Sequence, residues 1–381
     1  MSRLKHCASV ILLLQLFSGP AYSDPLADWR AEHSVSIDPS AKPVVPDSPE
    51  MFKMLIAPVE TKAAKGDAEA IKELCIYYCS MKATPKNSPD AVKWCLQGAE
   101  NGDSVSQFLL GEIYANGTHR AIQNYAEAAK WFQRAAEQGN VAAEYNLARY
   151  TYHGWGLPAN KTAAVELFRK ASDQGYSPAQ NTMGWLYVQG DAVKQDYGQA
   201  LSYFRAAADR QFPTALLNLG VMYEMGWGVK PDLTEAANWY QKAADRQHTA
   251  AMINLGSLAV RGPKRDYEKA LHWFLEAAER GDASGQFFIA NLYEEHLINP
   301  DKIEAYKWTS LALDAYREKG DKSGSSGRYF YPSDPLPAMA KDMTPDQLAE
   351  AQKKIASWKA SPRPGAVSLE IPFLTPLHVW P

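Results

Sequence analysis

Three cysteines that lie close together in the sequence are the residues best suited to chemistry. Cys75, Cys79 and Cys95 are the cysteines that follow residue 23. Cysteine side chains form disulfides, exchange them with free thiols, or bind metal ions as thiolates. No Cys-x-x-Cys pair occurs, and the eight histidines are scattered rather than gathered into a second ligand set. A structural disulfide or plain buried thiols are therefore favoured over redox exchange or a metal site, and we expect no cofactor.

Sequence patterns typical of enzymes do not stand out elsewhere. The sequence contains no His-Glu-x-x-His zinc motif and no Gly-x-Ser-x-Gly nucleophile elbow. The stretch Gly324-Ser325-Ser326-Gly327 falls in a predicted loop with no strand before it. Acidic pairs such as Glu294 and Glu295 are typical of a solvated helix surface. These observations predict a protein without catalytic residues and without an evident small-molecule substrate.

A repeat of about 36 residues must position whatever site the chain carries. Gly-Trp-Gly occurs at 154–156 and again at 226–228, which is two periods later. One small residue recurs in the same place of seven predicted first helices, and in five units a tyrosine follows three residues later. The small residues are Cys75, Gly111, Ala148, Gly184, Gly220, Gly256 and Ala290. A small side chain lets a neighbouring helix approach closely, and the tyrosine one turn later is expected to fill the space beside it.

A second helix in each unit carries an alanine, then a bulky residue three positions later, and in most units another alanine four residues after that. The first alanines are Ala91, Ala128, Ala164, Ala200, Ala236, Ala270 and Ala305. The bulky residues are Trp94, Trp131, Leu167, Tyr203, Trp239, Trp273 and Trp308. This spacing is helical, and the glycines between the two halves predict a turn. Each unit is thus a helical hairpin that must stack on its neighbours, which predicts an all-α, α/α superhelical solenoid.

The repeated pattern resembles that of the SEL-one-like repeat family, a relative of tetratricopeptide repeats. The resemblance rests on the small residue, the tyrosine, Gly-x-Gly-Val and Ala-x-x-Trp-[Tyr/Phe]-x-x-Ala-Ala, and covers residues from about 60 to 313. It implies a solenoid scaffold, which we place at 53–315. Unit one departs from the pattern, with Cys75 and Cys95 where a glycine and an aromatic residue are expected, and unit seven lacks the Gly-x-Gly turn.

The hairpin geometry makes a specific disulfide reasonable. If the first hairpin turns near position 85, Cys75 and Cys95 lie roughly opposite each other, and closing that loop contributes ~3 kcal/mol. Cys79, one helical turn from Cys75, competes as the partner.

A polar column precedes the small positions by two residues: Asn146, Thr182, Asn218 and Asn254. First helices of such superhelices usually line the inner groove, so these side chains, with Arg149 nearby, are candidates to bind an extended peptide. The alternative, which we favour somewhat, is that they satisfy neighbouring backbone groups or are simply solvated.

The two ends of the chain differ from the repeats. Arg3 and Lys5 precede an apolar run and the small residues of Ala21-Tyr22-Ser23, which predicts a signal peptide cleaved after Ser23 and an exported, periplasmic or secreted protein. Residues 24–52 are predicted as a flexible leader, 316–335 as a loop and 336–360 as a capping helix segment. The Pro-rich tail, 361–381, is apolar at Phe373, Leu377 and Trp380, and we expect it to contact the groove or a partner. Truncation after Pro362 is then predicted to change partner binding without loss of helicity.

Composition and resemblance together favour a non-catalytic scaffold that binds a protein or peptide in the cell envelope. With 40 basic and 43 acidic residues, the chain has no excess positive charge for nucleic acid. Membrane association is expected only through a partner. Two alternatives stay open: penicillin binding or β-lactam hydrolysis, proposed for a cysteine-rich branch of the family and testable with nitrocefin, and a structural part of a secretion, polysaccharide or motility complex.

Overall fold

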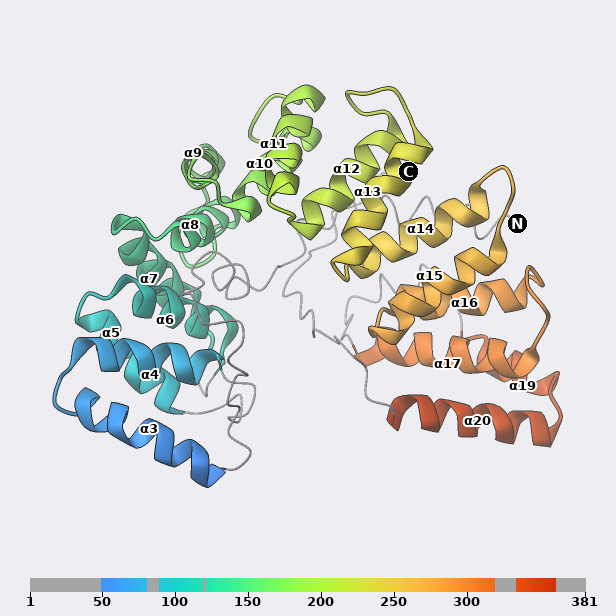
Figure 1. The fold of residues 1–381 in the computed structure, drawn as a ribbon, viewed down its shortest axis with the longest axis horizontal. Coiled ribbons are helices and arrows are strands. Elements are labelled where there is room, and N and C mark those ends of the chain that lie inside the picture. Colours follow the sequence, from blue (N-terminus) through green and yellow to red (C-terminus); the bar gives the residue numbers. More distant parts are fainter. Residues whose placement is uncertain (1–48, 81–88, 119–120, 319–333, 361–381) are drawn as a thin grey trace, which may run out of the picture. The chain divides into compact units, whose positions relative to one another are not determined.

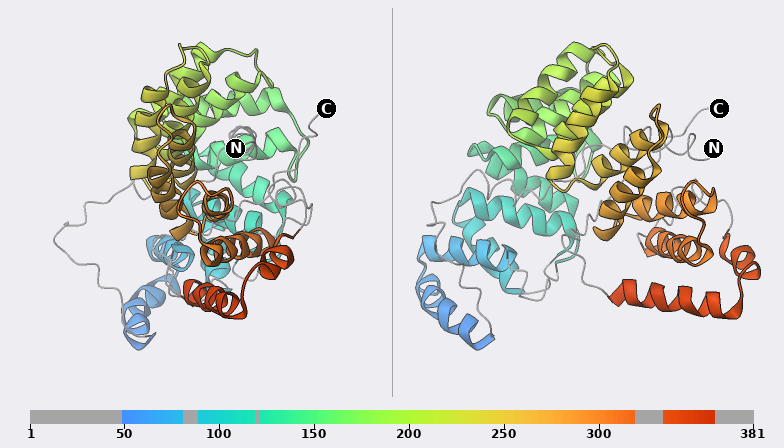
Figure 2. Two further views of the ribbon diagram at one scale, coloured as in Figure 1. Left: turned by 90° about the vertical axis from the view of Figure 1, so that its right-hand side faces the viewer. Right: turned by 45° about the vertical axis from the view of Figure 1, so that its right-hand side comes forward.

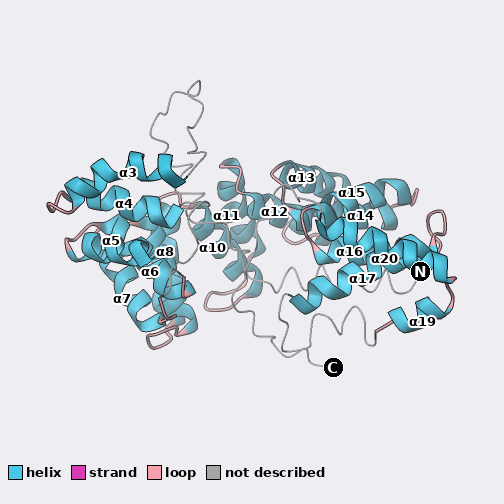
Figure 3. Ribbon diagram, turned by 90° about the horizontal axis from the view of Figure 1, so that it is seen from below, coloured by secondary structure: helices cyan, strands magenta, loops and turns pink. Residues whose placement is uncertain are grey.

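The described residues form helices joined by turns. The structure is a computed structural model, and it describes residues 49–80, 89–118, 121–318 and 334–360. No strand occurs within these ranges, as the colouring in Figure 3 shows. The all-α class predicted from the helical periodicity is therefore confirmed.

Helical hairpins follow one another along the chain, each with a first and a second helix (Figure 1). The first helices are α4 (Ala68–Ser80), α6 (Ser104–Asn116), α8 (Val141–His153), α10 (Ser177–Gln189), α12 (Pro213–Met225), α14 (Thr249–Arg261) and α16 (Ala283–Glu294). The second helices are α5 (Pro89–Glu100), α7 (Tyr125–Glu137), α9 (Lys161–Asp173), α11 (Tyr197–Asp209), α13 (Leu233–Asp245), α15 (Tyr267–Glu279) and α17 (Lys302–Glu318). Helix α3 (Pro49–Ala63) precedes them, and α19 (Leu336–Lys341) and α20 (Pro345–Ala360) follow.

Two compact units divide the described chain at Ala207 and Ala208. The N-terminal unit holds α3 to α10 and nearly all of α11, and the C-terminal unit holds the helices from α12 onward. Within each unit, consecutive hairpins pack side by side, so that the second helix of one hairpin contacts the first helix of the next (Figures 1 and 2). Among the described helices, none has both the length and the apolar composition needed to span a membrane.

The alanines of the second helices lie in the core, as their spacing predicts. Ala128, Ala164, Ala200 and Ala236 are all fully buried. Each lets the facing helix approach without a larger side chain in between, which is how hairpins of short helices keep a dense interior.

The ring beside the small position is not the one expected. A Cβ at Gly220 would lie 2.4 Å from ring atoms of Tyr240, and one at Gly111 would lie 2.6 Å from the ring of Phe132. The space is thus filled from the second helix, one residue after the tryptophans singled out in the sequence, and not by the tyrosine of the first helix. Residues three and four positions after an alanine both lie on the apolar face of a helix. Their spacing alone does not show which one faces the glycine.

The C-terminal helix α20 covers the last hairpin. Its start is a reciprocal cap, because the backbone N–H of Thr344 donates to Gln347 Oε1 at 2.9 Å and that of Gln347 donates to Thr344 Oγ1 at 3.2 Å. The Trp358 ring packs edge-on against Trp308 of α17, with ring centroids 4.9 Å apart. Glu304 of α17 accepts a 2.7 Å bond from Lys354, so both packing and charge hold α20 in place.

Several expected boundaries compare directly with the structure. Helix α3 begins at Pro49, inside the stretch 24–52 expected as a leader, and α17 runs to Glu318, past the expected start of the loop at 316. The signal peptide and the tail residues Phe373, Leu377 and Trp380 lie outside the described residues.

Candidate functional site

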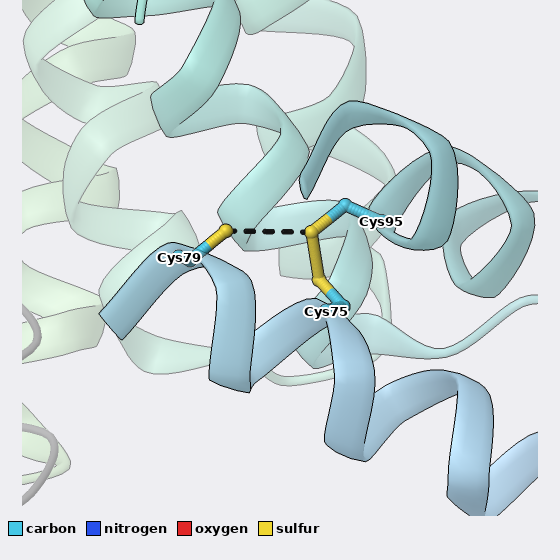
Figure 4. A group of neighbouring side chains, drawn as sticks. All are labelled: Cys75, Cys79 and Cys95. Atoms are coloured by element: carbon cyan, nitrogen blue, oxygen red, sulfur yellow. Dashed lines mark hydrogen bonds between the residues drawn. A yellow bond between two sulfur atoms is a disulfide. The ribbon is translucent and has the colours of Figure 1, made fainter. Parts of the chain in front are cut away.

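The three cysteines of the first hairpin meet at one point (Figure 4). Cys75 and Cys79 lie one turn apart on α4, and both side chains point toward Cys95 of α5. Cys75 and Cys95 form a disulfide with Cα atoms 4.6 Å apart, which is the pairing that the hairpin favoured. Cys79 keeps a free thiol, and its Sγ lies 3.4 Å from Sγ of Cys95.

This disulfide stands where other hairpins have a glycine and a ring. Cys75 aligns with Gly111, and Cys95 aligns with Phe132. Cys75 and Cys95 are fully buried, and so is Phe132. The first hairpin therefore joins its two helices by a covalent bond at the position where the second hairpin uses close packing.

The sulfur atoms do not form a metal site in this state. All three Sγ atoms lie within 4.8 Å of one another, which is close enough for a shared ion. Two of them are bonded to each other, however, and a disulfide offers no thiolate to a metal. Burial raises the pKa of Cys79 to about 12, so the remaining sulfur is a neutral thiol at neutral pH.

The predicted polar column lies inside the packed helices. Asn146, Thr182, Asn218 and Asn254 expose between 1% and 8% of their surface. The hydroxyl of Thr182 is 3.3 Å from that of Tyr145, on the neighbouring first helix. This burial favours the structural interpretation of the column, and peptide binding by these four residues stays a prediction.

Asn146 belongs to a polar contact that reaches the surface through Arg149. Its Nδ2 donates a 2.6 Å hydrogen bond to Glu112 Oε1 on the preceding first helix, and Arg149 lies 3.4 Å from its Oδ1. The amide is thereby oriented by two charged groups. Arg149 itself is half-buried, and its guanidinium also lies near the ring of Trp155, in the turn that follows α8.

Beside the C-terminal end of α8 lies a group of side chains that we call the Trp155 cluster: Tyr125 of α7, Arg149 and His153 of α8, and Trp155 in the turn that follows α8. The rings of His153 and Trp155 stack with centroids 4.4 Å apart, and Tyr125 stacks on Trp155 at 6.0 Å. The Arg149 guanidinium lies 5.7 Å from the Trp155 ring centroid. Desolvation lowers the pKa of His153, and the charges of Arg149 and Lys161 lower it further, so its ring is neutral at pH 7.

A glycine turn fixes Trp155 in place. Gly156 has a φ of +69°, and a Cβ there would lie 2.3 Å from the backbone of Tyr125. The turn therefore rests directly on the start of α7, where only glycine fits. Beside it, the Tyr152 hydroxyl donates to Asp191, which also accepts from Lys161 at 2.7 Å. These hydrogen bonds tie the last turn of α8, next to the cluster, to the turn that follows α10.

Of the Trp155 cluster, only Arg149 was predicted from the sequence. One sequence signal could have indicated the rest. The Gly-Trp-Gly triplet places a large ring in a turn, and a ring in a turn does not belong to the apolar stripe of either helix. The partners of that ring come from α7 and α8, which only the packing of the hairpins brings together.

Comparison with known proteins identifies the repeat. The sequence profile of the Sel1 repeat matches residues 68–103, 104–140, 141–176, 177–212, 213–248, 249–282 and 283–315. The Sel1 repeat protein from Oxalobacter formigenes is 25% identical, with a TM-score of 0.56 over 68% of this chain and 99% of that chain.

Two further solved structures show weaker similarity. The protective antigen c5321 of uropathogenic Escherichia coli is 19% identical, with a TM-score of 0.40 over 86% of this chain and 99% of that chain. The immunity protein Pa5087 of Pseudomonas aeruginosa is 20% identical, with a TM-score of 0.42 over 56% and 82%. No curated protein matches the sequence.

Proposed function

Because this chain belongs to the Sel1 repeat family, we propose that it is a non-catalytic scaffold that binds a protein partner through the Trp155 cluster. Sel1 repeat proteins generally act as scaffolds for protein interaction, and their fold is typically non-catalytic. The assignment of the binding site to this cluster rests on the chemistry and the rigidity of its residues.

The observation that carries the proposal is a partly exposed group of tryptophan, tyrosine and arginine on a rigid turn. These residue types dominate the binding energy of protein interfaces, because they combine a large contact area with a polar tip. Arg149 and Tyr125 flank the Trp155 ring, and the three groups come from two helices and a turn of the same unit. A rigid surface loses little conformational entropy when a partner binds.

Partner capture by matched variants tests this proposal. Full-length wild-type protein, Trp155→Ala, Arg149→Ala and Ile122→Ala are immobilised and exposed to an extract of the native host, and the retained proteins are quantified by mass spectrometry. Ile122 is the control because its side chain is 87% exposed in the same unit but lies outside the cluster. Circular dichroism verifies that each variant keeps its helicity.

A specific partner should be retained by wild type and Ile122→Ala and lost from both cluster variants. Removing a hot-spot side chain costs ~2 kcal/mol or more, which corresponds to at least a thirtyfold loss of affinity. If all partners bind the cluster variants as well as they bind wild type, the cluster is not the binding site.

We also propose that the protein is exported, with cleavage after Ser23. Support comes from the charged, apolar and small residues at the N-terminus and from the disulfide of the first hairpin, since disulfides persist in oxidising compartments. Edman sequencing of protein recovered from the native host should begin at Asp24. A chain that retains residues 1–23 would contradict the proposed cleavage.

A further inference from the structure

We propose that Cys79 is the attacking thiol of a three-cysteine exchange site. In this site the Cys75–Cys95 disulfide converts reversibly into a Cys79–Cys95 disulfide, and a small external thiol then opens the new bond. The ligand class is a low-molecular-weight thiol of the glutathione type. The inference is independent of the scaffold function, because it concerns the first hairpin alone.

The geometry places Cys95 within reach of two alternative partners. Residues i and i+4 lie on the same face of a helix, so Cys75 and Cys79 point toward the same strip of α5 (Figure 4). The Sγ of Cys79 lies 3.4 Å from that of Cys95. To attack, Cys79 Sγ must approach by a little more than 1 Å, to a bond length of about 2.05 Å, and must also move into line with the Cys95–Cys75 bond, which requires a change of side-chain rotamer.

The first step rearranges bonds without any change of oxidation state. The Cys79 thiol loses its proton, and the thiolate attacks Sγ of Cys95. The Cys79–Cys95 bond forms while the Cys75–Cys95 bond breaks. The departing electron pair stays on Cys75 Sγ, which takes up a proton. The products are again one disulfide and one thiol, so no oxidant or reductant is consumed.

The second step needs the external thiol. Its thiolate attacks Sγ of Cys79, forms a mixed disulfide and releases Cys95 as a thiol. A second external thiol attacks the mixed disulfide, releases Cys79 and leaves as the oxidised small-molecule disulfide. Two external thiols are thereby oxidised, and one protein disulfide is reduced to two cysteines.

Exposure decides the route by which the bond is opened. Cys75 and Cys95 are fully buried, whereas Cys79 is only half-buried. Of the three sulfurs, that of Cys79 is therefore the one that an external thiol reaches with the least local opening of the hairpin, and the original disulfide needs more. The raised pKa of Cys79 keeps its thiolate scarce at neutral pH, and this explains how a thiol can rest beside a disulfide and exchange only slowly.

Trapping of the free thiol tests the first step. Folded wild-type protein, Cys79→Ser and Cys75→Ser are incubated at pH 8.5 without reductant and quenched in acid, which stops exchange. The quenched proteins are unfolded in urea at acidic pH so that the buried Cys75 can be reached, labelled there with N-ethylmaleimide, and digested with pepsin for mass spectrometry. Wild type should carry label on Cys75 as well as on Cys79, and Cys75→Ser should contain a Cys79–Cys95 disulfide. Cys79→Ser should carry no label on Cys75 or Cys95. Label confined to Cys79 in wild type would overturn the proposal.

Reduction by glutathione tests the second step and does not depend on Cys75→Ser folding. Glutathione should reduce the disulfide of the folded protein about tenfold more slowly in Cys79→Ser than in wild type. Without Cys79, glutathione must attack the buried Cys75–Cys95 bond directly, and this attack requires local opening of the hairpin. Thermal unfolding of the oxidised forms verifies that both proteins are equally folded. Equal reduction rates would show that Cys79 does not mediate the opening.

Discussion

A Cβ atom at Gly220 would lie 2.4 Å from the ring of Tyr240, so the two helices of this hairpin touch where only a hydrogen fits. Tyr240 is fully buried, and its hydroxyl donates a 2.7 Å hydrogen bond to Glu224. Its ring therefore has no space into which to move.

We expect Gly220→Ala to destabilise the C-terminal unit. Overpacking of a dense core costs ~1–3 kcal/mol, while alanine recovers up to about 1 kcal/mol through its higher helix propensity. Urea unfolding followed by circular dichroism should show a lower midpoint. The matched control is Gly198→Ala, an exposed helical glycine whose Cβ would meet only the Asp196 side chain, at 3.2 Å. An unchanged midpoint for Gly220→Ala would contradict the observed close contact.

We expect Gly156→Ala to disturb the Trp155 cluster beyond the cost of backbone strain. The new Cβ would collide with the Tyr125 backbone, so the turn must lift and carry Trp155 with it. Gly139→Ala is the control, because Gly139 also has a positive φ, +80°, but open space around it. The free energy of unfolding measured in urea should fall further for Gly156→Ala, by ~1–3 kcal/mol, and captured partners should be reduced only for that variant. If Gly156→Ala and Gly139→Ala lost equal amounts of stability and of captured partner, the contact between Gly156 and the Tyr125 backbone would have no role in holding the cluster.

Loss of the Lys354–Glu304 ion pair should loosen α20. Glu304 accepts hydrogen bonds from Lys354, Lys307 and the Trp308 indole, at 2.7, 3.1 and 2.9 Å. Lys354→Ala is expected to weaken the docking of α20 by up to about 1 kcal/mol, because the lysine is partly exposed, and to speed hydrogen exchange of the α20 amides. Lys353→Ala, next to it but 82% exposed, should change neither. Similar exchange in both variants would contradict the assigned role.

Acid should release α20 for the same reason. Burial alone would raise the pKa of Glu304, but the ion pairs with Lys354 and Lys307 outweigh burial and lower it. A carboxyl whose pKa is lower in the folded state stabilises the fold above its ordinary pKa of about 4.5 and loses that contribution as the pH falls through the folded value. The protection factors of the α20 amides, which correct exchange rates for their intrinsic pH dependence, should therefore fall below this range. Glu304→Gln should remove most of this fall.

His248 should make the C-terminal unit sensitive to weak acid. Its Nδ1 is buried without a hydrogen-bond partner, and burial lowers its pKa to about 4, which Asp282 only partly opposes. The unfolded chain then binds a proton that the folded chain does not, so stability falls as the pH drops from about 6.5 to about 4, by ~2 kcal/mol. His248→Phe should flatten this part of the profile, since Phe212 fills the last position of an earlier repeat.

Thermal unfolding between pH 4 and pH 7 measures the effect of His248. His272→Gln serves as the control because His272 is exposed. Its stability should depend on pH as that of wild type does. A profile for His248→Phe that parallels wild type would show that another group is responsible for the slope.

The sequence predicted the repeat because periodicity reports directly which face of a helix is buried. The alanines at 128, 164, 200 and 236 and the capping box at Thr344 are local patterns, and the structure places them where the spacing requires. Hairpin geometry also brought Cys75 opposite Cys95. Such features depend on neighbours that are close in the chain.

Features that depend on how two helices are rotated against each other could not be derived in this way. That Tyr240 of the second helix fills the space beside Gly220, in place of the expected tyrosine of the first helix, depends on how the two helices are rotated against each other. The burial of Asn146 against Glu112 depends on the same kind of rotation, which residue spacing does not encode. The Trp155 cluster combines such a rotation with a turn, and turns carry no periodicity.

The covalent bond in the first hairpin gives the two ends of the chain different dependence on their environment. The later hairpins are joined by close packing, whereas the first is also joined by a disulfide, whose persistence depends on the redox potential of its surroundings. A shift toward reducing conditions would act on the N-terminal end of the array first, and the number of firmly joined repeats would then report the redox state of the compartment.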